Sequence, residues 1–580
     1  MGSVWRFIRP YKIPAGIAIM FMLSELAVEL VQPLLMAKII NEGVMEREPG
    51  VVLLWGGVML LLSVGAFLAG IMNTYYASHT SQGFSYDLRN STFRHIQSLS
   101  YSQFSIFSTG SLLTRLTNDI QQLQNTVFMM LRIMLRAPLL IIGGLAMALI
   151  VDVRMGMFLA VTVPVIFFFL IYIFTKGSRM FRIVQEKLDQ VNTVIGENLT
   201  GMKLIRAFQR RGYEEERFSE SNAELKEKTS SVLRFMEVTM PSLLLLMNIT
   251  IIIILWFGHK EINAANTDVG SVVAIVNYAT RITSSLSVFS FIVMAFSRAR
   301  ASALRLDEVL KTEPSMTNPA EPAESAGLKG EIAFRNVSFT YDNQSVYALK
   351  NLSFTVGPGK TLAVLGATGS GKSTLVNLIP RLYDAVEGTV AIDGTDVRDM
   401  KQTDLRMSIG VVPQTAMLFT GTIKENLLWG KRDATEEELE EACKAAQIYG
   451  LIERMPAGLD TRVGQKGVNL SGGQRQRLSI ARALMRKPAI LLFDDSTSAL
   501  DINTERRLLR ALENYHSTKI FVTQKISTAK EADKILLLKD GEKIAEGTHE
   551  ELMERSPLYN DILKSQNEEG RGSHVVQTDR

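Results

Sequence analysis

Hydrophobic residues gather in six long runs, and all six lie within the first 300 residues of the chain. The runs cover residues 13–40, 51–76, 135–151, 157–175, 240–258 and 271–296. A helix needs about 20 apolar residues to cross the hydrocarbon core of a bilayer, and each run has that length or comes close to it. Beyond residue 300 the longest apolar stretches, such as 489–493, suit only a β-strand. The pattern predicts six transmembrane helices followed by a water-soluble region that begins near residue 305.

Lysine and arginine are concentrated on one side of these predicted helices. They lie before the first run and in two long polar stretches, 77–134 and 176–236, whereas the connections at 41–50 and 152–156 are short. The positive-inside rule then places the N-terminus, both long stretches and the soluble region in the cytoplasm. Both stretches have helical spacing, so they would extend tens of Å from the bilayer at about 1.5 Å per residue. We expect their turns, near 104–110 and 201–208, to contact the soluble region.

The predicted domains are a six-span membrane domain at 1–305, a linker at 306–330 and a soluble domain at 331–580. The linker range is polar, aperiodic and interrupted by prolines. The 580 residues carry a formal net charge of only +4, so nucleic acid is not expected as a partner. Because the chain has a single cysteine, Cys443, a disulfide framework, a cysteine-based zinc site and an iron–sulfur cluster are excluded.

A phosphate-binding loop stands at the start of the soluble domain. A strand-like run at 361–365 leads into the pattern G-x-x-x-x-G-K-[ST], which is followed by a helical pattern. The loop residues are Gly366, Ala367, Thr368, Gly369, Ser370, Gly371, Lys372, Ser373 and Thr374. The glycines allow backbone N–H groups to face a β-phosphate, Lys372 can reach the β- and γ-phosphates, and Ser373 can ligate Mg²⁺. A second apolar strand, 490–493, ends at Asp494, which can hold Mg²⁺ through its water shell.

Between these two motifs lies a run that is similar to the signature of ATP-binding cassette (ABC) proteins. Its residues are Ser471, Gly472, Gly473 and Gln474, followed by the helical run 475–484. Other positions fit the same family: Tyr341 looks like the aromatic residue that stacks on adenine, Gln414 matches the Q-loop contact to Mg²⁺, and Asp501 matches the D-loop. The six-span region resembles an exporter-type membrane domain.

This resemblance implies a fold and a mechanism. The fold would be an all-α six-helix transmembrane domain with long cytoplasmic extensions, followed by an α/β P-loop cassette with a helical signature subdomain. Two cassettes would enclose two ATP molecules, each with Mg²⁺, and each ATP would lie between the phosphate loop of one cassette and the signature of the other. One membrane domain and one cassette make half a transporter, so a second half is the expected partner, in the plasma membrane.

The sequence departs from the family at two catalytic positions. The family has glutamate after the strand-ending aspartate, where this chain has Asp495, and histidine at the switch position, where it has Gln524. Asp495 is one methylene shorter, and a neutral amide cannot carry a positive charge or shuttle a proton. These changes predict a weak or inactive site that still binds ATP. They resemble the degenerate half of bacterial heterodimeric multidrug exporters, whose partner keeps the glutamate and histidine; a slow but competent site in a homodimer is the alternative.

Three polar residues lie within the first apolar run. Glu25, Glu29 and Gln32 fall on one helical stripe, where carboxylates at membrane depth usually face a cavity or a partner. They would attract cationic amphiphiles into an inward-facing cavity; alternatively they lie near the outer end of the span, hydrated or paired with Lys38 or the partner subunit. The leading functional hypothesis is export of amphipathic drugs or other hydrophobic compounds. Lipid or peptide export and a non-transporting, ATP-sensing regulatory or channel subunit remain as alternatives.

Overall fold

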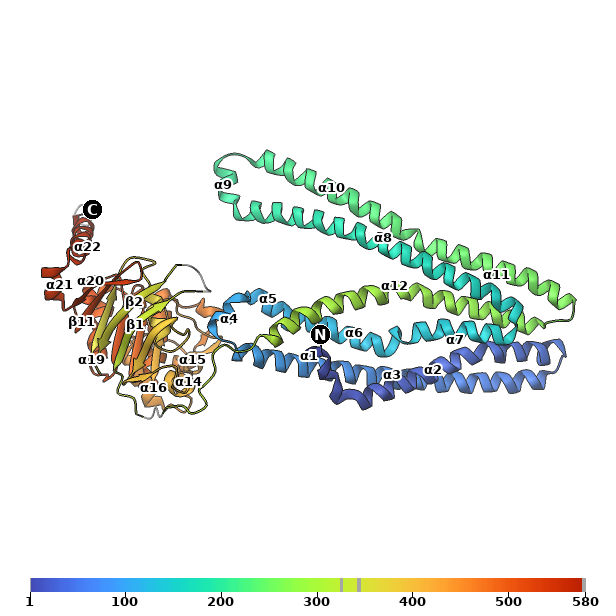
Figure 1. The fold of residues 1–580 in the computed structure, drawn as a ribbon, viewed down its shortest axis with the longest axis horizontal. Coiled ribbons are helices and arrows are strands. Elements are labelled where there is room, and N and C mark those ends of the chain that lie inside the picture. The colour runs from blue at the N-terminus through green and yellow to red at the C-terminus, as the bar shows by residue number, and fades with distance from the viewer. Residues whose placement is uncertain (1, 324–326, 342–345, 576–580) are drawn as a thin grey trace. The chain divides into compact units, whose positions relative to one another are not determined.

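The computed structural model describes residues 2–323, 327–341 and 346–575 (Figure 1). The chain forms two compact units. One comprises Met1–Gln97 and Thr109–Glu313, and we call it the membrane unit; the other comprises Ser98–Ser108 and Pro314–Arg580, and we call it the cassette unit. The short segment Ser98–Ser108, which includes part of the first predicted cytoplasmic turn, therefore belongs with the cassette.

The membrane unit is helical. Its α-helices are α1 (Gly2–Trp5), α2 (Lys12–Lys38), α3 (Pro49–Ser98), α5 (Thr109–Thr114), α6 (Ile120–Met129), α7 (Arg136–Val151), α8 (Val153–Thr200), α9 (Met202–Ala207), α10 (Arg211–Glu237), α11 (Thr239–Asn263) and α12 (Val269–Lys311). Short 3₁₀ or π segments join some of them: η1 (Arg6–Tyr11), η2 (Ile39–Met45), η3 (Arg115–Asp119) and η4 (Met130–Met134). Within the described residues, six helical stretches are long and apolar enough to cross a membrane, which confirms the predicted six spans.

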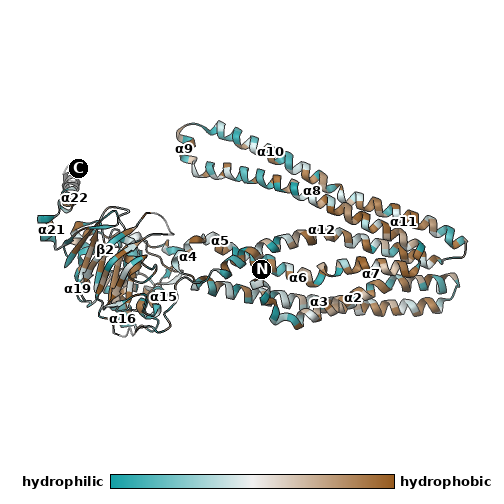
Figure 2. Ribbon diagram, viewed as in Figure 1, coloured by the Kyte–Doolittle hydropathy of each residue, from teal (hydrophilic) through white to brown (hydrophobic). Residues whose placement is uncertain are grey.

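Hydropathy varies along these helices as a membrane requires. Figure 2 shows hydrophobic residues along α7 and α11 and hydrophilic residues along α9 and α10, which lie in the second predicted cytoplasmic stretch. One apolar core packs α8, α11 and α12 around Met155, Ile254 and the fully buried Tyr278. The Tyr278 hydroxyl donates a hydrogen bond to the Leu30 carbonyl of α2 at 2.6 Å, so α2 and α12 are joined inside the unit.

The last membrane helix runs further than its apolar pattern suggested. α12 continues to Lys311, so the first six residues of the range predicted as linker, 306–311, are helical. The reason is that Leu306 and Val309 are fully buried and extend the apolar face of the helix. After Pro314 the chain already belongs to the cassette unit, where the Asn318 side chain accepts a hydrogen bond from the Gln402 backbone at 3.0 Å.

The cassette unit contains two main sheets. The strands are β1 (Ile332–Phe339), β2 (Leu349–Val356), β3 (Thr361–Leu365), β4 (Glu387–Ile392), β5 (Thr395–Asp396), β6 (Ile409–Val412), β7 (Gly421–Thr422), β8 (Arg462–Val463), β9 (Ile490–Asp494), β10 (Thr518–Val522), β11 (Lys534–Lys539) and β12 (Glu542–Gly547). An antiparallel sheet has the order β2-β1-β4-β5, a six-stranded sheet has the order β12-β11-β3-β10-β9-β6, and β7 pairs with β8. In the six-stranded sheet β11, β3, β10, β9 and β6 are parallel, and β12 is an antiparallel edge.

Helices cover these sheets and build a separate lobe. They are α4 (Tyr101–Ile106), α13 (Lys372–Leu378), α14 (Gln402–Met407), α15 (Ile423–Leu428), α16 (Glu436–Ala445), α17 (Tyr449–Ile452), α18 (Gly472–Leu484), α19 (Ile502–Glu513), α20 (Ile526–Ala529), α21 (His549–Arg555) and α22 (Pro557–Val575). The 3₁₀ turns η5 (Gly458–Asp460) and η6 (Gln465–Gly467) complete the list.

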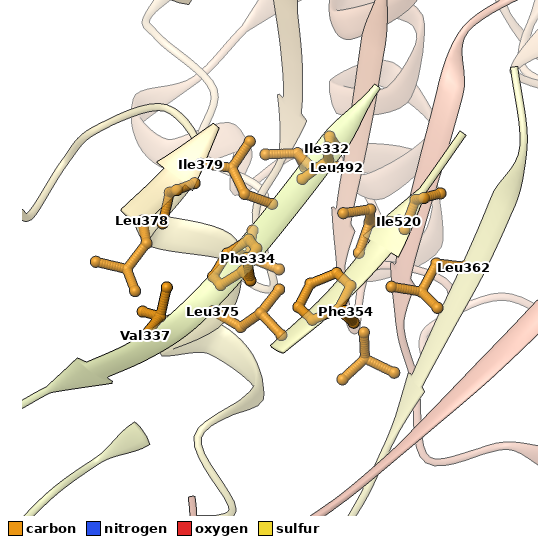
Figure 3. Packing of buried hydrophobic residues seen from close by; sticks show 14 of the residues in the cluster. Ile332, Phe334, Val337, Phe354, Leu362, Leu375, Leu378, Ile379, Leu492 and Ile520 are labelled. Atoms are coloured by element: carbon orange, nitrogen blue, oxygen red, sulfur yellow. The ribbon is translucent and has the colours of Figure 1, made fainter. Parts of the chain in front are cut away.

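The main cassette core lies between the two sheets. Figure 3 shows Phe334 and Phe354 of the antiparallel sheet close to Leu375 of α13 and to Ile520 of the parallel sheet. The two phenylalanine rings stack with their centroids 4.6 Å apart. This core holds α13 against β9 and β10. Because β3, β10 and β9 are parallel neighbours, the loops that follow them begin at the same edge of the sheet, where ligands bind in open α/β folds.

A second core forms the helical lobe around α15, α16 and α18, and Cys443 of α16 is fully buried in it. Burial raises the pKa of the Cys443 thiol to about 12, with a smaller contribution from the nearby charge of Glu440. Since the thiolate is the reactive form, this cysteine should be inert at ordinary pH.

We expect Cys443 to resist iodoacetamide at pH 8 in the folded protein and to react rapidly in denaturant. The folded thiol stays protonated at that pH because its pKa is raised, and the core also excludes the reagent. The measurement is alkylation followed by mass spectrometry, and the signal is unambiguous because the chain has one cysteine. Rapid labelling of the folded protein at pH 8 would contradict the packing of this lobe.

Candidate functional site

A cavity of about 320 Å³ lies beside the phosphate loop. Most residues of the predicted nucleotide site line it: Tyr341, Thr368, Gly369, Gly371, Lys372, Ser373, Thr374, Gln414, Asp494, Asp495 and Gln524. They come from segments that are far apart in the sequence and meet because β3, β10 and β9 are neighbours in the parallel sheet. Gly366, Ala367 and Ser370 complete the loop behind this lining. Ser471, Gly472, Gly473, Gln474 and Asp501 do not line the cavity.

The phosphate loop has the backbone shape that its glycines allow. Gly369 and Gly371 have φ values of +84° and +94°, in the left-handed region that glycine adopts without penalty. A Cβ added to Gly371 would also lie 2.5 Å from the Ala348 carbonyl oxygen, so a side chain there has no room. The loop therefore turns sharply into the N-terminus of α13, where backbone N–H groups can face an anion.

Lys372 is held by the loop itself. Its side chain is largely buried, and Nζ donates hydrogen bonds to the Gly366 and Ala367 carbonyls at 2.8 and 2.6 Å. Burial lowers the pKa of Lys372, while the charges of Asp495 and Asp494 oppose this effect. Because the partners of the Lys372 ammonium are neutral carbonyls, the ammonium can move to the phosphate oxygens of a nucleotide. No buried carboxylate would lose its partner in that exchange.

Oxygen atoms suited to Mg²⁺ gather beside Lys372. The Ser373 hydroxyl donates to Asp494 Oδ1 at 2.9 Å, and Gln414 forms a side-chain hydrogen bond with Asp495. Burial raises the pKa of Asp494, and the Ser373 hydrogen bond opposes it. Mg²⁺ prefers a few protein oxygens together with phosphate oxygens and water, so Ser373, Asp494 and Gln414 fit this ion.

The aromatic wall of the cavity rests on a second tyrosine. The Tyr341 and Thr374 hydroxyls form a hydrogen bond at 2.9 Å, and the Tyr341 ring meets Tyr383 edge-on at 5.3 Å. Tyr383 also meets Tyr101 of α4 edge-on at 5.6 Å. The helix α4, which contains Tyr101, is also hydrogen-bonded to Ser315: the Ser315 backbone N–H donates to the Gln103 side chain at 3.1 Å. A chain of three tyrosines thus joins the expected adenine contact to the first predicted cytoplasmic turn; α9, near the second, belongs to the membrane unit.

Asp495 has an unusual backbone. Its φ of +46° lies in the left-handed region, which aspartate tolerates better than most residues, and its N–H donates to the Val522 carbonyl at 2.9 Å. Burial raises the pKa of its carboxyl group, and Lys372 and Lys525 oppose this effect. The carboxylate that stands in the family's glutamate position therefore faces the cavity and is engaged by Gln414.

The switch segment is clamped from two sides. Gln566 of α22 accepts a hydrogen bond from the Ile526 N–H at 2.9 Å and donates one to the Gln524 carbonyl at 2.5 Å. On the other side, Lys525 Nζ pairs with Glu505 at 2.9 Å and donates to the Thr497 carbonyl at 3.2 Å. Sequence reasoning missed Gln566, Lys525 and Tyr383, because nothing local to their positions indicates these distant partners.

The signature forms the N-terminus of α18. The Gln474 N–H donates to Ser471 Oγ at 3.3 Å, and the Ser471 N–H donates to Gln474 Oε1 at 2.9 Å, which is a capping box. Gly472 meets no atom that would block an added Cβ. Asp501 caps α19 in a similar way through the Thr504 N–H at 3.0 Å, and these hydrogen bonds lower the pKa of its carboxyl group. The signature helix end is thus shaped by its own side chains and does not line the cavity of its own chain.

The polar residues of the first membrane helix are paired within the chain. Arg136 donates to Glu25 and Glu29, both at 2.7 Å, and Arg281 lies 3.3 Å from Glu29. Gln32 accepts from Arg281 at 2.9 Å and donates to Ser63 at 3.1 Å. Lys38, one of the alternative partners considered from the sequence, instead lies 3.8 Å from Glu42. Because both carboxylates are neutralised, the electrostatic argument that they attract cations does not hold in this conformation.

We expect Gln566→Met to loosen the switch segment with little change in side-chain size. It removes two hydrogen bonds, each contributing about 1 kcal/mol, so exchange of the Ile526 amide hydrogen should accelerate at least about fivefold. The control is Gln447→Met, which removes only a contact to the Lys444 carbonyl at the end of α16. Equal exchange in the two variants, measured by mass spectrometry, would contradict the clamp.

Comparison with known proteins agrees with this geometry. Residues 15–286 match the family described as ABC transporter transmembrane region, and residues 349–498 match the family described as ABC transporter. The chain is 54% identical over 566 residues to the uncharacterized ABC transporter ATP-binding protein YfiB of Bacillus subtilis (strain 168), and the match covers 98% of each chain.

Two further relatives carry more specific names. One is the putative multidrug export ATP-binding/permease protein YgaD of Bacillus subtilis (strain 168), 31% identical, covering 98% of this chain and 99% of that protein. The other is the ATP-dependent lipid A-core flippase of Desulfotalea psychrophila (strain LSv54 / DSM 12343), 32% identical, covering 95% and 96%.

A solved structure has the same fold. It is that of a bacterial Atm1-family ABC exporter with ATP bound, with a TM-score of 0.78 and 24% identity, covering 95% of this chain and 97% of that chain. With its membrane region and its ATPase domain in one polypeptide, this chain belongs to the ABC transporter family, as a multi-pass, exporter-type half-transporter of the kind that works as a dimer in a membrane.

Proposed function

We propose that this chain is one subunit of a heterodimeric, ATP-driven exporter of amphipathic compounds. Its own nucleotide site holds ATP and Mg²⁺ with little or no hydrolysis, and its signature completes the active site of a partner that has the glutamate and histidine. The positive-inside distribution of lysine and arginine supports a cytoplasmic location for the N-terminus and the cassette unit.

The observation that carries this proposal is the pair of departures from the family pattern within the lining of the cavity. Asp495 and Gln524 both line it, and they occupy the two positions where the family has glutamate and histidine. Aspartate loses roughly 1.5 Å of reach, and a displacement of about 1 Å can lower a rate about 100-fold. Gln524 can donate a hydrogen bond to a γ-phosphate but cannot supply a positive charge.

In contrast to the two altered catalytic positions, the residues expected to bind ATP and Mg²⁺ are all present. Lys372 and the N–H groups at the start of α13 would hold the β- and γ-phosphates, and Tyr341 would stack on adenine. Mg²⁺ would be held by Ser373, Asp494 and Gln414 and would neutralise phosphate charge. Loss of the catalytic groups with retention of the binding groups supports a site that keeps ATP in place.

The intact signature supports a catalytic partner. Ser471 forms the capping box that shapes the start of α18, and Gly472 keeps this helix end open for a phosphate. A chain that only sensed ATP would have no need of this helix end, so the observation favours a transporting subunit over a regulatory one.

Lipid export is the second candidate function. It is favoured by the similarity to a relative named as a lipid A-core flippase, while the relative named as a putative multidrug exporter favours drugs. Both have comparable identity to this chain, so transport of labelled lipid and of drug-like dyes by the assembled pair decides between them.

We expect the purified wild-type chain, verified as a homodimer, to bind ATP with Mg²⁺ and to hydrolyse it very slowly. Asp495→Glu combined with Gln524→His should raise turnover by about 100-fold, because it restores the reach and the charge at the γ-phosphate. ATP affinity should change little, which separates catalysis from binding. Brisk hydrolysis by the wild-type homodimer would contradict the degenerate site.

We expect Ser471→Ala to lower ATP hydrolysis by a heterodimer with a partner that has the glutamate and histidine. The substitution removes the cap that shapes the helix end facing the partner's ATP. Loss of a helix cap also costs about 1 kcal/mol of stability, so the control is Thr435→Ala, which removes an equivalent capping box from α16. Equal rates in the two variants would remove the argument that the signature serves the partner.

A further inference from the structure

A groove of about 660 Å³ lies in the membrane unit between α2, α3 and η4. Phe67, Ile71 and Tyr75 of α3 form its apolar wall, and all three side chains are exposed. Arg132 of η4 and Thr74 of α3 form its polar end. This volume is within the range of sites that take drug-sized ligands.

The charges around this groove do not cancel. Glu25 lines it, but Glu25 is ion-paired with Arg136 through Oε1, and Glu29 is ion-paired with Arg136 through Oε2 and with Arg281 through Oε1. Two carboxylates and two guanidinium groups form a neutral cluster. Arg132 stands outside that cluster, four residues before Arg136 in the chain, and leaves one positive charge in excess.

Arg132 has only a neutral partner. Among the residues that the structure describes, it forms a hydrogen bond with the Thr74 hydroxyl, and no recorded ion pair includes it. Its side chain is exposed. A guanidinium group presents several N–H donors in one plane and matches a carboxylate, phosphate or sulfonate better than any neutral group.

The position of Arg132 along its span suits the head of an amphiphile. It precedes Val151, the last residue of α7, by about 20 residues, which is roughly 30 Å of helix and close to the thickness of the hydrocarbon core. The turn after Val151 is on the outer side in the proposed orientation. Arg132 then lies near the inner leaflet, and Phe67, earlier in antiparallel α3, lies deeper in the bilayer.

We propose that this groove binds a drug-sized amphiphile with one anionic head group, which sits on Arg132 and Thr74 while its apolar body packs against Phe67, Ile71 and Tyr75. The proposal rests on the proposed export function and names its substrate class. It replaces cationic amphiphiles, which the neutralised Glu25 and Glu29 would not attract and which Arg132 would repel. Gly70 contributes to the shape of the groove, since a Cβ there would lie 3.4 Å from Glu25 Oε2.

The test is direct binding to the full chain in phosphatidylcholine nanodiscs without ATP. The probes are 11-(dansylamino)undecanoic acid and its neutral methyl ester, followed by dansyl fluorescence. We expect the acid to bind about tenfold more tightly than the ester. Arg132→Gln should abolish this preference and Arg132→Lys should keep most of it. Arg154→Gln, at an exposed arginine paired with Glu261 near the opposite end of the bundle, is the matched control and should change nothing.

Each outcome decides the proposal. Equal affinity for acid and ester, tighter binding of a dansyl alkylamine, or an unchanged preference in Arg132→Gln would overturn it. Displacement of the acid by phosphatidylglycerol in the discs would assign the groove to a bilayer phospholipid and would also overturn it; persistence of binding supports a drug-sized occupant. Because the assay needs neither hydrolysis nor a second subunit, its failure is distinguishable from failure of the heterodimer proposal.

Discussion

Charges withdrawn from water need partners inside the protein, and this requirement shapes both units of the chain. In the membrane unit Glu25 and Glu29 lie within an apolar span and are only partly exposed, and Arg136 and Arg281 neutralise them. The cluster joins α2, α7 and α12, and breaking any one partner would leave a charge whose desolvation is not repaid. Helix packing in this region is therefore specified by ion pairs as well as by apolar contacts.

The same requirement appears at the edge of the nucleotide cavity. Glu505 is buried and is satisfied by Lys525 and by the Thr528 hydroxyl at 2.7 Å, so α19 is tied to the switch segment. Lys372 is satisfied by carbonyl oxygens of its own loop. The cavity therefore holds a cation whose present partners are neutral and which can turn to phosphate, which is the preorganisation that phosphate binding needs.

Binding and catalysis make different demands on this geometry. Binding depends on backbone N–H groups and on one lysine, which the phosphate loop supplies locally. Catalysis depends on the reach of one carboxylate and on the charge of one switch residue. A displacement of such a group by about 1 Å is enough to lower the rate strongly. Aspartate at position 495 and glutamine at position 524 therefore bear on the proposed loss of turnover, while the phosphate loop keeps its binding groups. In the membrane unit Glu25 and Glu29 are paired with arginines, so Arg132 gives the proposed groove a net positive charge.

Sequence alone determined what depends on contiguous residues. Apolar runs of membrane-spanning length identified the six spans, and the phosphate loop, Asp494 and the Ser471–Gln474 signature could each be located from a short stretch of sequence. Tertiary structure decided the partners that lie far apart in the chain. Arg136 rather than Lys38 pairs with Glu25 because α7 packs against α2, Gln566 reaches the switch segment because α22 returns to α20, and Tyr383 supports Tyr341 because the core brings their loops together. The end of α12 at Lys311 was also decided there, since burial of Leu306 and Val309 outweighs the polar composition around them. Local motifs specify backbone shape by themselves, whereas which charge meets which depends on how the helices pack.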